Sequence, residues 1–121
     1  MYAGLAVLLT WPLCANLNQA FLGYPTIDAL DTIMLRGVVS DLLFNHPGDI
    51  PTTTGIYYPT GVPVLQWTPN VLDHILGGSF AAALGFPTGD NAFWLAVMTA
   101  NGLAAHRLGL QLSGNHSGAV L

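Results

Sequence analysis

The sequence contains no lysine and no glutamate. Its charge comes from six aspartates and two arginines, which make up 7% of the 121 residues, whereas a typical soluble domain is about 25% charged. A solvated surface normally uses both missing residues, so the composition excludes an ordinary soluble monomer. With 52% hydrophobic residues and a mean hydropathy of +0.54, the chain is predicted to be a membrane protein that contacts a lipid bilayer.

Two further absences exclude other classes of function. The net charge of −4 argues against a nucleic-acid partner, because neutralising phosphates requires clustered lysine and arginine. Cys14 stands alone, so no intrachain disulfide and no cysteine-based metal site can form. No basic segment precedes the first apolar stretch, and this counts against a cleaved secretory signal.

Three segments are predicted to be transmembrane. Residues 1–19 are short for a span, so we expect the chain to begin partway into a first transmembrane helix. Residues 91–112 give about 22 residues, or roughly 33 Å of helix, enough for a second one. Residues 113–121 read as a cytoplasmic turn and the start of a third, since Arg107 beside that turn favours the inner side.

Residues 20–90 are the predicted extracytoplasmic loop, with helices near 27–45 and 70–84. In the first helix an apolar face is opposed by a polar one, so it is suited to lie along a membrane surface. Asp73 falls in the first turn of the second helix, and Asp90 or Asn91 caps the span that follows. The fold class is therefore mainly α, with membrane helices and an external loop that carries amphipathic juxtamembrane helices. The apolar face comprises Leu30, Ile33, Met34, Val38 and Leu42, and the polar face Asp28, Thr32, Arg36 and Ser40.

Candidate chemistry is concentrated at the head of the first loop helix. Asp28 and Asp31 lie three residues apart, so either carboxylate can act as a general base, or both can share a divalent cation. The structural alternatives are an N-cap for Asp28 and a helix-dipole role for Asp31. The sequence leaves both interpretations open.

Four other residues are candidates for substrate binding. Arg36 and His46 are the nearest groups that could bind a phosphate, although Arg36 also fits a solvated partner of Thr32 and Ser40. Tyr57 and Tyr58 could line a sugar site or lie at a bilayer interface.

The layout of these segments resembles a known family. A first span ends in Trp-Pro, and an outer loop carries Asp28 and Asp31. The stretch YYPTGVPVLQWTPN and a second span ending in NGLAAHRLGLQLSGNHSGAVL follow. Together they resemble the amino-terminal part of a bacterial multispanning GT-C-type glycosyltransferase, over essentially the whole chain and in layout more than in a strict motif.

The resemblance implies a function. Such enzymes transfer a sugar from a polyprenyl-phosphate donor to an envelope acceptor on the outer face of the bacterial inner (cell) membrane, with a first-loop acid as base. Asp28 or Asp31 would match that acid, and a divalent cation remains open as cofactor. As part of a longer multi-pass enzyme, this piece is not expected to be active by itself.

The competing hypothesis is a non-catalytic multispanning membrane protein, such as a transporter or polymer-export component, whose acids only solvate the outer loop. Transporters usually place ionisable residues within their spans. The predicted span interiors here hold none except near one end. The sequence therefore favours the enzyme.

Overall fold

The computed structural model describes residues 1–23, 27–45, 52–53, 59–63, 70–116 and 118, and this part of the chain is mainly helical, as predicted. Helices α2 and α4 coincide within a residue with those expected near 27–45 and 70–84. The bounds are α1 Tyr2–Leu9, the 3₁₀ helix η1 Leu13–Ala15, α2 Ile27–Phe44, α4 Val71–Leu84 and α5 Thr88–Ser113, with two short antiparallel strands, β1 Thr52–Thr53 and β2 Val62–Pro63.

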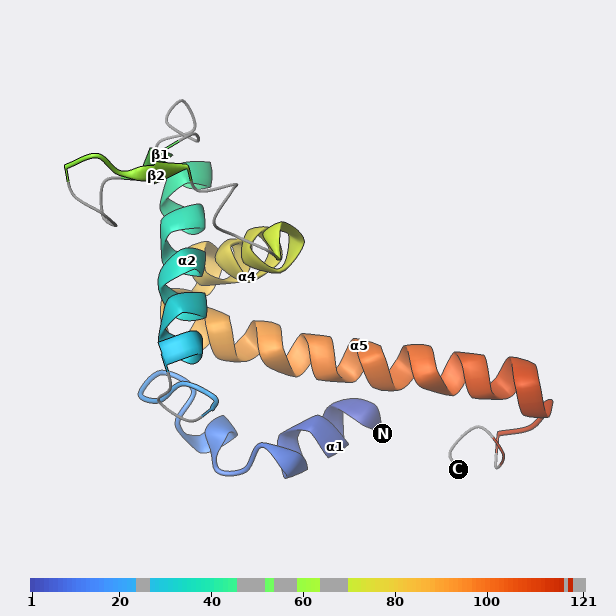
Figure 1. Ribbon diagram of the computed structural model, residues 1–121. Helices are drawn as coiled ribbons and strands as arrows, with labels where there is room; N and C mark the ends of the chain where they lie inside the picture. The colour runs from blue at the N-terminus through green and yellow to red at the C-terminus, as the bar shows by residue number, and fades with distance from the viewer. Residues whose placement is uncertain (24–26, 46–51, 54–58, 64–69, 117, 119–121) are drawn as a thin grey trace.

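The helices form two groups that meet at the N-terminal end of α5. Helix α1 runs antiparallel to α5 and packs on its side, whereas α2 crosses near the start of α5 at a steep angle (Figure 1). Helix α4 packs against both α2 and α5. Helices α2 and α4 therefore cover one end of the α1–α5 pair.

The first helix is shorter than the predicted segment 1–19. Helix α1 ends at Leu9, where the Thr10 hydroxyl donates to the Ala6 carbonyl at 2.8 Å. Pro12 follows, and a proline has no N–H to continue a helix. The chain then bends through η1 and runs on to α2.

The long helix α5 extends beyond its predicted bounds of 91–112. It has 26 residues and ends where Gly114 adopts φ 71°, a left-handed conformation that glycine takes without steric cost. No helix in the described ranges combines the length and the apolar character that a membrane crossing requires.

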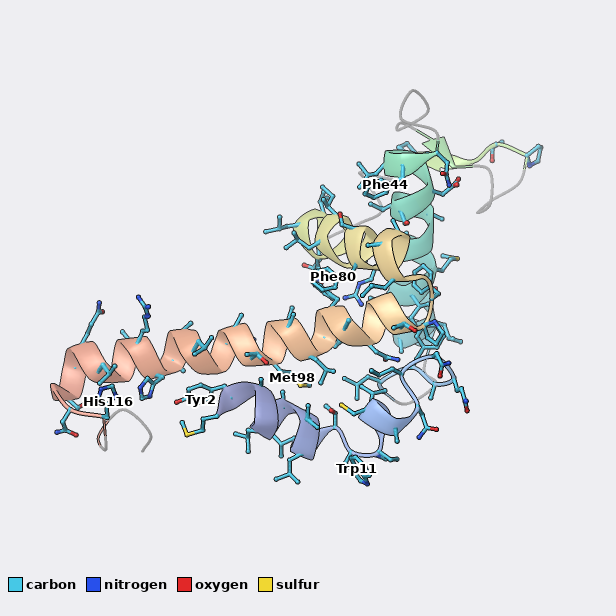
Figure 2. The ribbon with its side chains drawn as sticks, turned by 180° about the vertical axis from the view of Figure 1, so that it is seen from behind. Tyr2, Trp11, Phe44, Phe80, Met98 and His116 are labelled. Atoms are coloured by element: carbon cyan, nitrogen blue, oxygen red, sulfur yellow. The ribbon has the colours of Figure 1, made fainter. Side chains whose placement is uncertain are left out.

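The interior of the described chain is unusually polar. Its largest fully buried side chains are Arg36, Asp90 and Asn91. Large apolar side chains instead project from the outer surfaces of α1 and α5, as Figure 2 shows for both helices. The apolar surface is thus mostly outside, and buried polar contacts join the helices.

Candidate functional site

A buried cation joins the three helices at the start of α5. Arg36 of α2 is fully buried, and its Nη2 donates to Asp73 Oδ2 of α4 at 2.8 Å while its Nη1 donates to Asp90 Oδ1 of α5. The guanidinium carbon also lies 4.6 Å from the ring centre of Phe93 and 5.0 Å from that of Trp94, within cation–π range. We call Arg36, Asp73 and Asp90 the Arg36 cluster.

This placement changes the interpretation of Arg36. Both terminal nitrogens are engaged by carboxylates, and a phosphate has no exposed face of the guanidinium to approach. The sequence also allowed Arg36 to be a solvated residue on the polar face of α2. With 0% exposure, the side chain is not solvated. Arg36 is therefore a structural cation, and its guanidinium is not accessible to a substrate phosphate.

Two glycines of α4 make room for the cluster. A Cβ on Gly77 would lie 2.5 Å from Arg36 Nε and 2.7 Å from Arg36 Cδ. A Cβ on Gly78 would lie 3.1 Å from the Arg36 carbonyl oxygen and 3.2 Å from the Ser40 nitrogen. Consecutive glycines inside a helical pattern are the sequence signal for such a close approach.

Asn91, the residue after Asp90, holds the segment that leads to α2. Its fully buried side chain donates from Nδ2 to the carbonyls of Leu17 and Ala20, at 2.9 and 2.6 Å, and accepts from the Leu22 amide at 3.0 Å. Two consecutive residues of α5 thus fix α2 and the chain before it. The sequence suggested only a capping role for Asp90 or Asn91, whereas α5 begins earlier, at Thr88.

His74 is the buried titratable group beside the Arg36 cluster. It is 4% exposed, and its Nδ1 has no hydrogen-bond partner among the described residues. Burial lowers the pKa of His74, the Asp73 carboxylate opposes that shift, and the positive charge of Arg36 adds to it. The folded protein therefore favours a neutral imidazole here.

This pKa predicts a pH-dependent stability. The unfolded chain protonates His74 more readily than the folded protein does. The stability that the neutral His74 contributes is therefore fully present well above pH 6.5, the ordinary histidine pKa, and is lost as the pH falls below that value. Denaturant unfolding between pH 7.5 and 5.5 should show a larger loss of stability in the wild type than in His74→Gln. The substitution removes only this one titratable group, so equal losses in the two proteins would contradict the prediction.

The predicted catalytic residues are only partly described. Helix α2 begins at Ile27, so Asp28 and Asp31 belong to its N-terminal end, and the Asp31 side chain is half-buried. The Asp28 side chain lies outside the description, as do His46, Tyr57 and Tyr58 entirely. Within the described ranges no three histidine, cysteine or acidic side chains gather as a metal site. The proposed Asp28–Asp31 cation pair stays a prediction.

The Arg36 cluster thus supports α2 near its middle, and Asp31, a candidate carboxylate, lies one turn into that helix. The sequence did not predict the Arg36 cluster because Asp73 and Asp90 lie 37 and 54 residues after Arg36 in the chain. Their pairing is a tertiary contact that helical periodicity does not encode. No family model matches the chain, and neither the curated proteins nor the solved structures contain a significant match.

Proposed function

We propose that the chain is part of an integral-membrane glycosyltransferase that moves a sugar from a lipid-phosphate donor to an envelope acceptor on the outer face of the membrane. Asp28 or Asp31 is the base. The observation that best supports the proposal is the arrangement of α2 and α4 across one end of the α1–α5 pair (Figure 1). In the proposed protein, α2 and α4 would be juxtamembrane helices lying across the outer end of the helices that contact lipid.

The exposed apolar side chains support contact with lipid. They occur along both α1 and α5, and leaving such side chains in water costs about 25 cal/mol per Å². Acyl chains would cover them without that cost. They include Leu5, Leu8 and Leu9 of α1 and Met98, Leu103, Leu108 and Leu112 of α5.

The ionisable residues of α5 lie away from its middle, where the exposed polar residue is the uncharged Asn101. Asp90 and Asn91 are at its N-terminal end, buried and hydrogen-bonded beneath α2 and the preceding segment. His106 and Arg107 lie toward its other end, where a long basic side chain can extend to the headgroups. These residues lower the mean hydropathy of α5 without requiring an unpaired charge at the bilayer centre.

The surface of α2 fits a helix lying on a membrane. Part of its predicted apolar face is uncovered by protein, with Leu30 58% and Met34 39% exposed, whereas the other three residues of that face are half-buried. The face with Leu35 and Arg36 packs inward instead. In the proposed orientation, the uncovered face meets the lipid headgroups, and the first turn of α2 lies at the level of a lipid phosphate.

The proposed chemistry requires one base. A carboxylate at the head of α2 takes the proton of the acceptor hydroxyl as its oxygen attacks the anomeric carbon, and the lipid phosphate departs with the electrons of the broken C–O bond. Because Arg36 is engaged, the departing phosphate must be stabilised by other groups of the complete protein or by a divalent cation. Asp28 and Asp31 are the residues that would hold such a cation.

The test is transfer from a radiolabelled polyprenyl-phosphate sugar by the full-length protein in membranes. Loss of a general base typically lowers the rate by about 10²–10⁴-fold, so Asp28→Asn or Asp31→Asn should reduce transfer by that factor. Asp41→Asn is the matched control, since Asp41 is an exposed acid near the other end of α2. Wild-type transfer in both head variants would refute the catalytic role and favour the non-catalytic alternative.

A further inference from the structure

A hollow of about 490 Å³ opens between the end of α1 and the segment 16–23 that leads to α2. Trp11 forms part of its wall, and Figure 2 shows this residue at the bend after α1. The hollow lies on the chain just before α2, whose first turns carry Asp28 and Asp31. It is separate from the Arg36 cluster, none of whose residues lines it.

The lining combines two aromatic rings, those of Trp11 and Phe21, with carboxamides and no charge. The Trp11 side chain is 66% exposed, although most large rings of a folded protein are covered. Asn16 and Gln19 add the two carboxamides; Asn16 Nδ2 already donates to the Pro12 carbonyl at 3.2 Å, and its Oδ1 remains an acceptor. Since no lining residue is ionisable, the lining suits a neutral ligand and offers nothing to balance a phosphate.

Hydrogen bonds fix the backbone on both sides of the hollow. Asn91 bonds the backbone of Leu17, Ala20 and Leu22, three positions of the segment that forms one wall. On the opposite wall, the Thr10 hydroxyl is bonded to the carbonyl of Ala6. A preformed wall reduces the ordering cost of binding, so even a small ligand can bind measurably.

We propose that this hollow binds a neutral pyranose, the sugar of the lipid-linked donor. One face of a pyranose presents C–H groups that pack on the electron-rich face of Trp11, and its hydroxyls match the carboxamides of Asn16 and Gln19. The volume suits a small ligand rather than a long polymer. The proposal rests on the proposed function and adds a sugar subsite on the segment that precedes α2, the helix of the candidate bases.

The donor is the favoured source of the sugar because of where the hollow lies. It is at the end of α1, a helix whose exposed leucines we assign to the bilayer. A sugar attached to a membrane lipid is confined to that level, whereas an acceptor can approach from the aqueous side.

The direct test is binding of methyl glycosides of glucose, galactose and mannose to the full-length protein in lipid nanodiscs, measured by saturation-transfer NMR. At least one glycoside is expected to bind, and Trp11→Ala should weaken it by tenfold or more. Trp11→Phe retains a ring and should retain most of the binding, whereas Gln19→Ala should weaken it several-fold. Phe44→Ala removes another exposed ring, near the end of α2, and should leave binding unchanged.

Three results would overturn the proposal: no glycoside binding, binding insensitive to Trp11→Ala, or competition by alkyl chains without a sugar headgroup. The last would identify an acyl chain as the occupant. Thermal unfolding of each variant should match the wild type, because Trp11 is mostly exposed. If Trp11→Ala unfolds at a lower temperature than the wild type, Trp11→Gln would replace it, because glutamine is a polar side chain suited to this exposed position.

A kinetic measurement separates this proposal from the function on which it rests. In the transfer assay, Trp11→Ala should raise KM for the donor about as much as it weakens glycoside binding, with KM for the acceptor unchanged. An increase confined to the acceptor would overturn the donor assignment. Active wild-type enzyme with an unchanged donor KM in Trp11→Ala would refute the subsite alone, whereas Trp11-dependent glycoside binding without any transfer would refute the glycosyltransferase alone.

Discussion

Replacement of Arg36 by leucine is expected to lower the free energy of unfolding by about 3–5 kcal/mol, the usual cost of breaking a buried ion pair from one side. The substitution leaves Asp90, 1% exposed, without its counter-charge, and Asp73 loses its partner on the same guanidinium. It also removes the cation packed against Phe93 and Trp94. Denaturant unfolding of the protein in detergent micelles, followed by circular dichroism, would measure the change.

Arg107 provides the matched control for this prediction. It is the other arginine of the chain and is exposed on α5, so Arg107→Leu should change stability by only about 0.5 kcal/mol. The double variant Arg36→Leu/Asp90→Leu should recover part of the loss, because it removes the unpaired buried carboxylate as well. Equal stabilities for Arg36→Leu and Arg107→Leu would show that the Arg36 cluster does not hold the helices together.

Gly89→Ala is expected to destabilise the protein by about 3 kcal/mol, the upper part of the range for overpacking a close contact. A Cβ at this position would lie 2.5 Å from Ala81 Cα and 2.6 Å from Ala81 N, backbone atoms of α4 that cannot rotate away. Helices α4 and α5 would have to separate, and the adjacent Asp90 would move with α5. The thermal unfolding midpoint in micelles would report the loss.

Gly4→Ala is the control for Gly89→Ala. Gly4 lies within α1, and a Cβ there would meet no atom within 4 Å. Alanine favours the helix over glycine by roughly 0.5–1 kcal/mol, so this variant should be as stable as the wild type or more stable. If Gly89→Ala behaved like Gly4→Ala, the close approach of α4 to α5 would not be a determinant of the fold.

Local chemistry was sufficient to predict most helices. The apolar spacing from Leu30 to Leu42 and the prolines and glycines between the segments indicated α2 and α4 nearly to the residue. The predicted first segment is longer than α1, which ends at Leu9 shortly before Pro12, a residue with no N–H to continue the helix. The mean hydropathy of an apolar stretch does not reveal a single residue that ends the helix.

The candidate carboxylates were also identified from sequence, since two acids at the head of an amphipathic helix form a local pattern. The contacts that support this helix were not identified from the sequence. Arg36 falls on the polar face of α2 beside Thr32 and Ser40, and a single helix gives no reason to bury it. The burial arises from Asp73 and Asp90, which belong to other helices.

The sequence by itself therefore determined that this chain is helical, poor in charge and acidic at the head of α2, because composition and short-range spacing encode those properties directly. Only the tertiary structure decided what the few charges do. With so little charge available, one arginine is buried with Asp90 and paired also with the half-buried Asp73, since a charge removed from water must be paired. That pairing depends on glycines which let the helices meet and on an asparagine that fixes the segment before α2.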